Sequence, residues 1–187
     1  MKIDNKLIVN TIGGTGSTLV VNIILGFFEP DQPVVGITKY HQQLIKEHKF
    51  RQVFDNFSSR MVLKAHFMEM FDYIDTKYIT THRSNKPMSN KIYNRDNIVV
   101  LEYSELLYKS EYNPHSNKSV ERVINYVANE IENKFLDIKI TEHQRKSSHE
   151  RVLNMDKMYE SIKHKPFQYF DPFYHIHGSH RNRTIKK

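Results

Sequence analysis

A cluster of glycines separates two apolar stretches near the start of the chain. Residues 6–12 are mainly apolar and β-branched, a pattern typical of a buried strand. Residues 17–28 are apolar almost all round, which is typical of a helix buried against a sheet. Three of the chain's 6 glycines stand between them, at positions 13, 14 and 16. This unit of strand, glycine turn and helix constrains the chain to an α/β arrangement that begins with a tight junction.

Further strand and helix patterns alternate along the chain. Strands are predicted at 60–65, 78–81 and 97–102, and helices near 42–54 and over 120–135. A capping box at Thr141 predicts one more helix, whose polar composition favours a solvent-facing or lid-like position. The expected fold is α/β, a parallel β-sheet flanked by helices, in a single domain over residues 1–187. Residues 167–187 are expected to form a basic, mobile tail.

Composition narrows the classes of protein that this chain can belong to. Of the 187 residues, 39% are hydrophobic, which is too many for global disorder. The absence of cysteine excludes disulfides, cysteine-ligated zinc and a thiol nucleophile. No apolar run is long enough to span a bilayer and no secretory signal pattern is present, so we expect a cytoplasmic protein without membrane contact. A net charge of +7 predicts anionic partners, although lysines spread over a solvated surface would give the same total.

The glycine cluster has the properties of a phosphate-binding loop. Glycines let backbone N–H groups approach an anion, and the following helix adds the positive end of its dipole. A tight turn without a ligand is the alternative. The loop lacks the lysine of the Walker A motif, and Leu19 occupies the place of the third Rossmann glycine. The candidate binding residues are Gly13, Gly14, Thr15, Gly16, Ser17 and Thr18.

Four separated stretches resemble, in the same order, the motifs of the PAPS-dependent sulfotransferases. The stretches are 14–19, 61–67, 78–83 followed by Ser89, and 99–107. Residues 177–182 resemble the family's C-terminal segment more weakly. The resemblance implies a P-loop-like nucleotide-binding fold, PAPS (3′-phosphoadenosine 5′-phosphosulfate) as donor, PAP as product, and no metal. It also implies transfer of the sulfuryl group to a hydroxyl or amine acceptor, with a small molecule or carbohydrate favoured over a protein.

By this resemblance, His66 is the general base and Lys64 neutralises the phosphosulfate. The family's loop carries a basic residue where this chain has Gly14, so Lys64 is its candidate substitute. Ser89 follows Arg83 more closely than the family spacing allows. The remaining donor-binding residues implied are Arg83 and Ser89 for the 3′-phosphate, Tyr103 for adenine, and His177, Gly178, His180 and Arg181 closing over the donor.

Taken by themselves, these residues leave other interpretations open. His66 could be a surface histidine, Arg83 part of a surface ion pair, and Tyr103 a structural core residue. The histidines at 175, 177 and 180 match no common zinc spacing and have no carboxylate close by, so no metal is expected. Two functions remain as alternatives: an atypical P-loop phosphotransferase, or a nucleotide- or nucleic-acid-binding module without catalysis. Nucleic acid is the less expected ligand.

Overall fold

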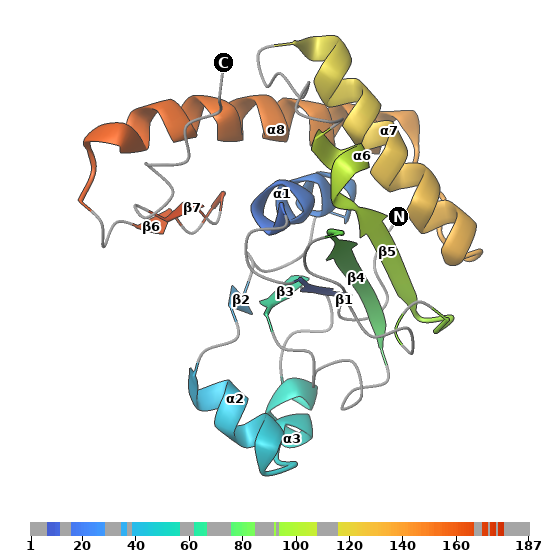
Figure 1. Cartoon of the computed structure of the whole chain (residues 1–187), viewed down its shortest axis with the longest axis vertical. Helices are drawn as coiled ribbons and strands as arrows, with labels where there is room; N and C mark the ends of the chain where they lie inside the picture. Colours follow the sequence, from blue (N-terminus) through green and yellow to red (C-terminus); the bar gives the residue numbers. More distant parts are fainter. Residues whose placement is uncertain are drawn as a thin grey trace.

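Five parallel strands form the centre of the computed structural model (Figure 1). The structure describes residues 7–11, 16–28, 35–36, 39–56, 62–66, 76–84, 92, 94–107, 116–166, 170–171, 173–174 and 176–177. The strands lie in the order β2-β3-β1-β4-β5, which confirms the predicted parallel sheet flanked by helices. Their bounds are β1 (Leu7–Asn10), β2 (Val35–Gly36), β3 (Val62–Ala65), β4 (Lys77–His82) and β5 (Ile98–Glu102).

The strand order creates a switch point beside β1. From β1 the chain passes through α1 (Ser17–Phe28) to β2 at one edge of the sheet, beyond β3. From β3 it crosses β1 to reach β4 on the other side. The connections after β1 and β3 thus lead to opposite sides of the sheet. Open α/β sheets bind ligands at the carboxyl ends of two neighbouring strands with this arrangement. The switch point therefore lies at the carboxyl ends of β1 and β3.

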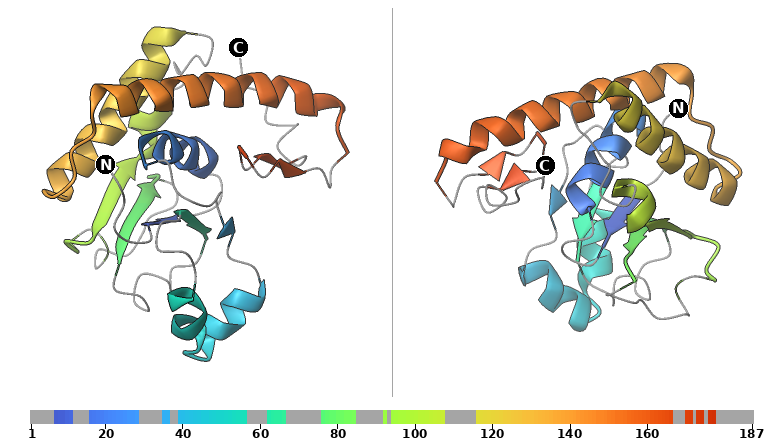
Figure 2. Two further views of the ribbon diagram at one scale, coloured as in Figure 1. Left: turned by 180° about the vertical axis from the view of Figure 1, so that it is seen from behind. Right: turned by 45° about the horizontal axis from the view of Figure 1, so that its top comes forward.

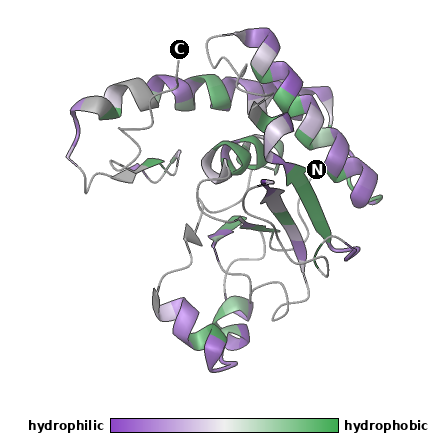
Figure 3. Ribbon diagram, in the orientation of Figure 1, coloured by the Kyte–Doolittle hydropathy of each residue, from purple (hydrophilic) through white to green (hydrophobic). Residues whose placement is uncertain are grey.

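Both faces of the sheet are buried. Side chains alternate along a strand, so Leu7 and Val9 share one face, and they join the core that includes α1, α7 (Asn117–Lys134) and α8 (Glu142–Ser161). On the other face, Ile8 pairs in register with Leu63 and Tyr78, and all three are buried. Figure 3 shows hydrophobic residues concentrated in α1 and β5. Burial on both faces explains why β1 and β5 contain continuous apolar runs.

Helix α8 packs along α1 through one face, while the opposite face, with Glu142, Lys146 and Glu150, is exposed to solvent as its composition predicted. Its contact face is made of Gln144, Ser148, Val152 and Met155, all buried. Ser148 Oγ donates to the Ile23 carbonyl at 2.9 Å, and Gln144 Nε2 donates to the Phe27 carbonyl at 2.6 Å. Gly26 lies against the Ser148 backbone, so closely that a Cβ there would overlap it. The buried contact with α1 was not predicted, because this close helix crossing uses small and polar residues, which hydrophobic periodicity does not detect.

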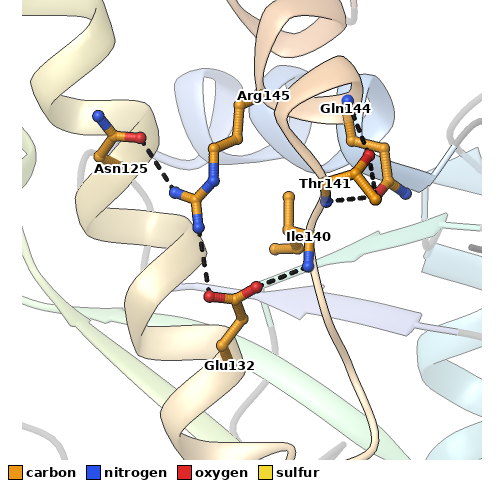
Figure 4. A network of polar contacts seen from close by, with 6 residues as sticks. All are labelled: Asn125, Glu132, Ile140, Thr141, Gln144 and Arg145. Carbon is orange, nitrogen blue, oxygen red and sulfur yellow. Dashed lines mark hydrogen bonds and ion pairs between the residues drawn. The ribbon is translucent and has the colours of Figure 1, made fainter.

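A polar network joins α7 to the start of α8 (Figure 4). The Glu132 carboxylate accepts from the Ile140 N–H at 2.6 Å and from Arg145 at 3.2 Å, and Arg145 also donates to Asn125 at 3.0 Å. Next to it, Thr141 and Gln144 form the predicted capping box. These bonds tie α7 to the start of α8.

Smaller differences from the predictions concern short elements. The expected helix near 42–54 is two helices, α2 (Lys39–Lys46) and α3 (Phe50–Asp55), separated where His48 has a φ of 56°. The tail contains an antiparallel hairpin, β6 (Phe170–Asp171) and β7 (Ile176–His177), beside α1 and under the carboxyl-terminal half of α8 (Figures 1 and 2). Within the described residues, the other elements are α6 (Tyr103–Leu107) and the 3₁₀ turn η2 (Ile162–His164). Within the described ranges, no helix has the length and apolarity needed to cross a membrane.

Candidate functional site

The described candidate residues gather at the carboxyl edge of the sheet, around the amino end of α1. Gly16, Ser17 and Thr18 open α1, while Lys64 and His66 come from the end of β3. Arg83 follows β4 and Tyr103 follows β5. Several candidates lie outside the described residues: Gly13, Gly14, Thr15, Ser89, Gly178, His180 and Arg181; of His177, only the backbone in β7 is described.

Lys64 lies buried beneath the first turn of α1. It shares its face of β3 with Val62, the face that packs against α1, and its side chain is only 6% exposed. Its Nζ donates to Thr18 Oγ1 at 3.3 Å, and Thr18 is itself 4% exposed. A buried ammonium is costly unless polar groups surround it. The structure thus directs a cationic group from the neighbouring strand toward the helix end whose backbone N–H groups already favour an anion.

His66 is held at the end of β3 by the residue that follows β1. The Thr11 N–H donates to the Ala65 carbonyl at 3.1 Å, which extends the β1–β3 pairing by one residue. His66 Nδ1 lies 2.6 Å from the Thr11 carbonyl oxygen. Because a carbonyl can only accept, this bond assigns the proton to Nδ1 and makes Nε2 the basic nitrogen. The His66 side chain is exposed, which suits a group that exchanges protons with a bound molecule.

Arg83, Tyr103 and Gly16 form a second group on the other side of β1. The Arg83 guanidinium carbon lies 4.7 Å from the centre of the Tyr103 ring. A Cβ at Gly16 would meet Tyr103 at 3.7 Å and Leu106 at 3.6 Å. Gly16 has a φ of 82°, a conformation in which glycine is strongly preferred. The ends of β4 and β5 are thereby brought against the loop end that begins α1.

The His82–Glu102 pair at the same edge was not predicted. His82 Nδ1 lies 2.9 Å from both carboxylate oxygens of Glu102, its partner in the β4–β5 register. The Glu102 N–H donates to the Tyr126 hydroxyl at 2.8 Å. Burial, together with the carboxylates of Glu130 and Glu102, raises the pKa of Tyr126 to about 12. The available signal was positional: each residue of the pair directly precedes a predicted site residue, Arg83 or Tyr103.

No metal site was found in the part of the chain that the structure describes. Among those residues, no group of three or more His, Asp or Glu side chains is placed to hold an ion. Two of the three histidines weighed in the sequence, His175 and His180, lie outside the described residues. The groups described at this edge are the cations Lys64 and Arg83, the histidines His66 and His82, and the amino end of α1.

Comparisons with known proteins do not assign the chain to a family. No protein-family model matches the chain, and no curated protein matches it. The function is therefore inferred from the motif resemblance and from the positions of these side chains.

Proposed function

We propose that this protein is a sulfotransferase that binds PAPS at the carboxyl edge of its sheet and transfers the sulfuryl group to a hydroxyl or amine. One observation carries the proposal. Four stretches far apart in the sequence contribute neighbouring groups around the amino end of α1: Gly16 to Thr18, Lys64 with His66, Arg83, and Tyr103. These are the described parts of the stretches that resemble the donor-binding motifs of the family.

The first element of the proposal is an anion site without a basic residue in the loop. The amino end of α1 contributes its dipole, and Ser17 and Thr18 contribute hydroxyls in the first turn. Lys64 adds the positive charge from β3, within hydrogen-bond distance of Thr18. The lysine therefore compensates for Gly14, and in a buried setting its charge acts strongly on a phosphosulfate.

The second element is general base catalysis by His66. Its Nε2 takes the proton of the acceptor hydroxyl or amine while the acceptor atom forms its bond to sulfur. The bond between sulfur and the bridging phosphate oxygen breaks, and its electron pair leaves with PAP. Lys64 stabilises the negative charge that develops on that oxygen. The bond from Nδ1 to the Thr11 carbonyl keeps the ring in the tautomer that this step requires.

The third element is recognition of the 3′-phosphate by Arg83. The Tyr103 ring lies under the guanidinium and restricts its rotation. A fixed planar guanidinium can offer two parallel N–H donors to one phosphate, which a lysine cannot do. This arrangement favours a nucleotide with a phosphate on the ribose as well as on the 5′ position.

Binding of PAP, ATP with magnesium, and AMP tests the proposal. At a PAP concentration about 100 times Kd, the stabilisation is about 2.7 kcal/mol, a rise in Tm of about 5–11 °C for a chain of this size. Stabilisation by ATP alone would favour the phosphotransferase instead. Salt-dependent binding of nucleic acid, unaffected by PAP, would favour the binding module.

Two variants separate the roles of the residues. Arg83→Lys should weaken binding of PAP about tenfold but leave AMP, which has no 3′-phosphate, unchanged. The matched control is Arg51→Lys, because Arg51 forms an exposed ion pair with Asp55 on α3. His66→Ala should abolish PAP release from PAPS with a panel of sugar and phenol acceptors while PAP still binds. Turnover equal to wild type would remove His66 from the mechanism.

A further inference from the structure

A buried asparagine links the candidate donor site to the hairpin at residues 170–177. Asn22 lies in α1, one turn after Thr18, and is 0% exposed. Its Nδ2 donates to the Thr18 carbonyl at 2.9 Å and to the Tyr174 carbonyl at 2.8 Å. An asparagine in an otherwise apolar buried helix is unfavourable unless its amide is hydrogen-bonded. Here the amide joins the first turn of α1 to the hairpin.

Arg151 of α8 completes the connection. Its Nε donates to Asn22 Oδ1 at 3.1 Å, and its terminal nitrogen donates to the Phe173 carbonyl. The guanidinium also stacks on Phe173 and Tyr174, with its carbon 4.3 and 5.3 Å from the ring centres. One guanidinium thus contacts α1 and the two hairpin residues Phe173 and Tyr174.

The hairpin is organised to dock as one unit. Phe170 pairs with His177 and Asp171 with Ile176, and Asp171 Oδ1 accepts the Tyr174 N–H at 2.7 Å. Ile176 is buried in the main core. A unit of this kind can dock and release as a whole, and a ligand that favours the docked state would then shift that equilibrium.

We propose that Asn22 and Arg151 are positioning residues that couple docking of the hairpin to donor binding at the amino end of α1. The inference rests on the proposed function. Thr18 is the shared element: its hydroxyl accepts from Lys64 and its carbonyl accepts from Asn22. A docked hairpin orders the first turn of α1 for the donor, and a bound donor holds the hairpin in place, because coupling between two sites is reciprocal.

The test compares two arginines of the same helix. Arg151→Met removes the connection, whereas Arg145→Met removes an arginine that bonds Glu132 and Asn125 of α7. We expect Arg151→Met to raise the Kd for PAP about tenfold, and Arg145→Met to leave it unchanged even where both lower Tm. In the wild-type chain, saturating PAP should slow hydrogen exchange of the Tyr174 and Ile176 amides, and Arg151→Met should abolish that protection.

Each outcome decides the matter. An unchanged Kd in Arg151→Met, or no protection of the hairpin by PAP, overturns the coupling. If Arg151→Met does not fold, Arg151→Lys keeps the charge but cannot bond Asn22 and Phe173 together, and it must still raise the Kd. If the wild-type chain binds ATP but not PAP, the proposed function fails and the same variants with ATP test the coupling. If it binds none of the nucleotides, both proposals fall.

Discussion

The two ends of helix α1 bury polar groups in different ways. At the amino end, Thr18 accepts from the Lys64 ammonium at the open edge of the sheet. In the carboxyl half, the carbonyls of Ile23 and Phe27 accept from Ser148 and Gln144 of α8, and Gly26 allows the two helices to approach. The first arrangement brings a charge next to a helix end. The second joins two crossing helices through hydrogen bonds between neutral groups.

This difference separates binding from stability along one helix. A buried charge contributes little to folding, because desolvation offsets its attraction to its partners, but it can act strongly on an anionic ligand. Neutral hydrogen bonds and close packing contribute to folding and offer nothing to a ligand. Substitutions at the two ends should therefore change different measured quantities.

The largest effect is expected for Gly26→Ala. The added methyl group overlaps the Ser148 backbone, so α8 must move and its bonds to Ile23 and Phe27 weaken. We expect a loss of about 3 kcal/mol in the free energy of unfolding, a fall in Tm of about 6–12 °C by thermal denaturation. Asn129→Ala, on the exposed face of α7, is the control. Wild-type stability in Gly26→Ala would contradict the close crossing.

A smaller effect, on a different quantity, is expected for Lys64→Met. Loss of the buried ammonium should raise the Kd for PAP about 30-fold, equivalent to about 2 kcal/mol, while Tm without ligand stays close to wild type. Calorimetric titration measures the affinity. Lys77→Met, at the opposite end of the sheet in β4, should leave the Kd unchanged. A large fall in Tm with an unaltered Kd would mean that the two ends of α1 do not differ as described.

Ser148→Ala is a milder change at the contact between α8 and the carboxyl half of α1. The hydroxyl's bond to the Ile23 carbonyl is lost without overlap, so we expect about 1 kcal/mol of destabilisation and a fall in Tm of about 2–4 °C. PAP affinity should not change. The adjacent Ser147→Ala is the matched control, because Ser147 is only partly buried. Reduced PAP affinity in Ser148→Ala alone would show that the crossing also serves the site.

The last effect, confined to alkaline pH, concerns Tyr126, whose hydroxyl accepts from the Glu102 N–H at the end of β5. Its pKa is about 12 in the folded chain against 10.0 ordinarily, so between these values the unfolded chain has lost a proton that the folded chain keeps. Stability should therefore be unaffected below pH 10 and fall as the pH rises toward 12. Denaturant unfolding of wild type and Tyr126→Phe over this range checks it: the variant should show a shallower decline. Parallel declines would mean that Tyr126 is not shielded by burial.

Most of the sheet could be predicted from the sequence. The patterns near β1, β3, β4 and β5, the helix at α1 and the capping box of α8 are confirmed. The short strand β2 and the hairpin could not be predicted, because two-residue strands carry no period and are stabilised by their neighbours. The candidate site residues were each predicted from a separate motif. Because these motifs lie far apart in the chain, the sequence did not predict which of their side chains would be in contact.

What the sequence determined by itself is local: apolar period, glycine freedom and capping depend on residues a few positions apart, so α1 and the strands follow from them. Only the tertiary structure decided which groups meet. Lys64 reaches Thr18 because β3 lies beside β1, and Asn22 reaches Arg151 and Tyr174 because α8 crosses α1 at Gly26. Those pairings span 46 to 152 residues and arise from how the buried faces fit together, a property that no short stretch of the chain contains.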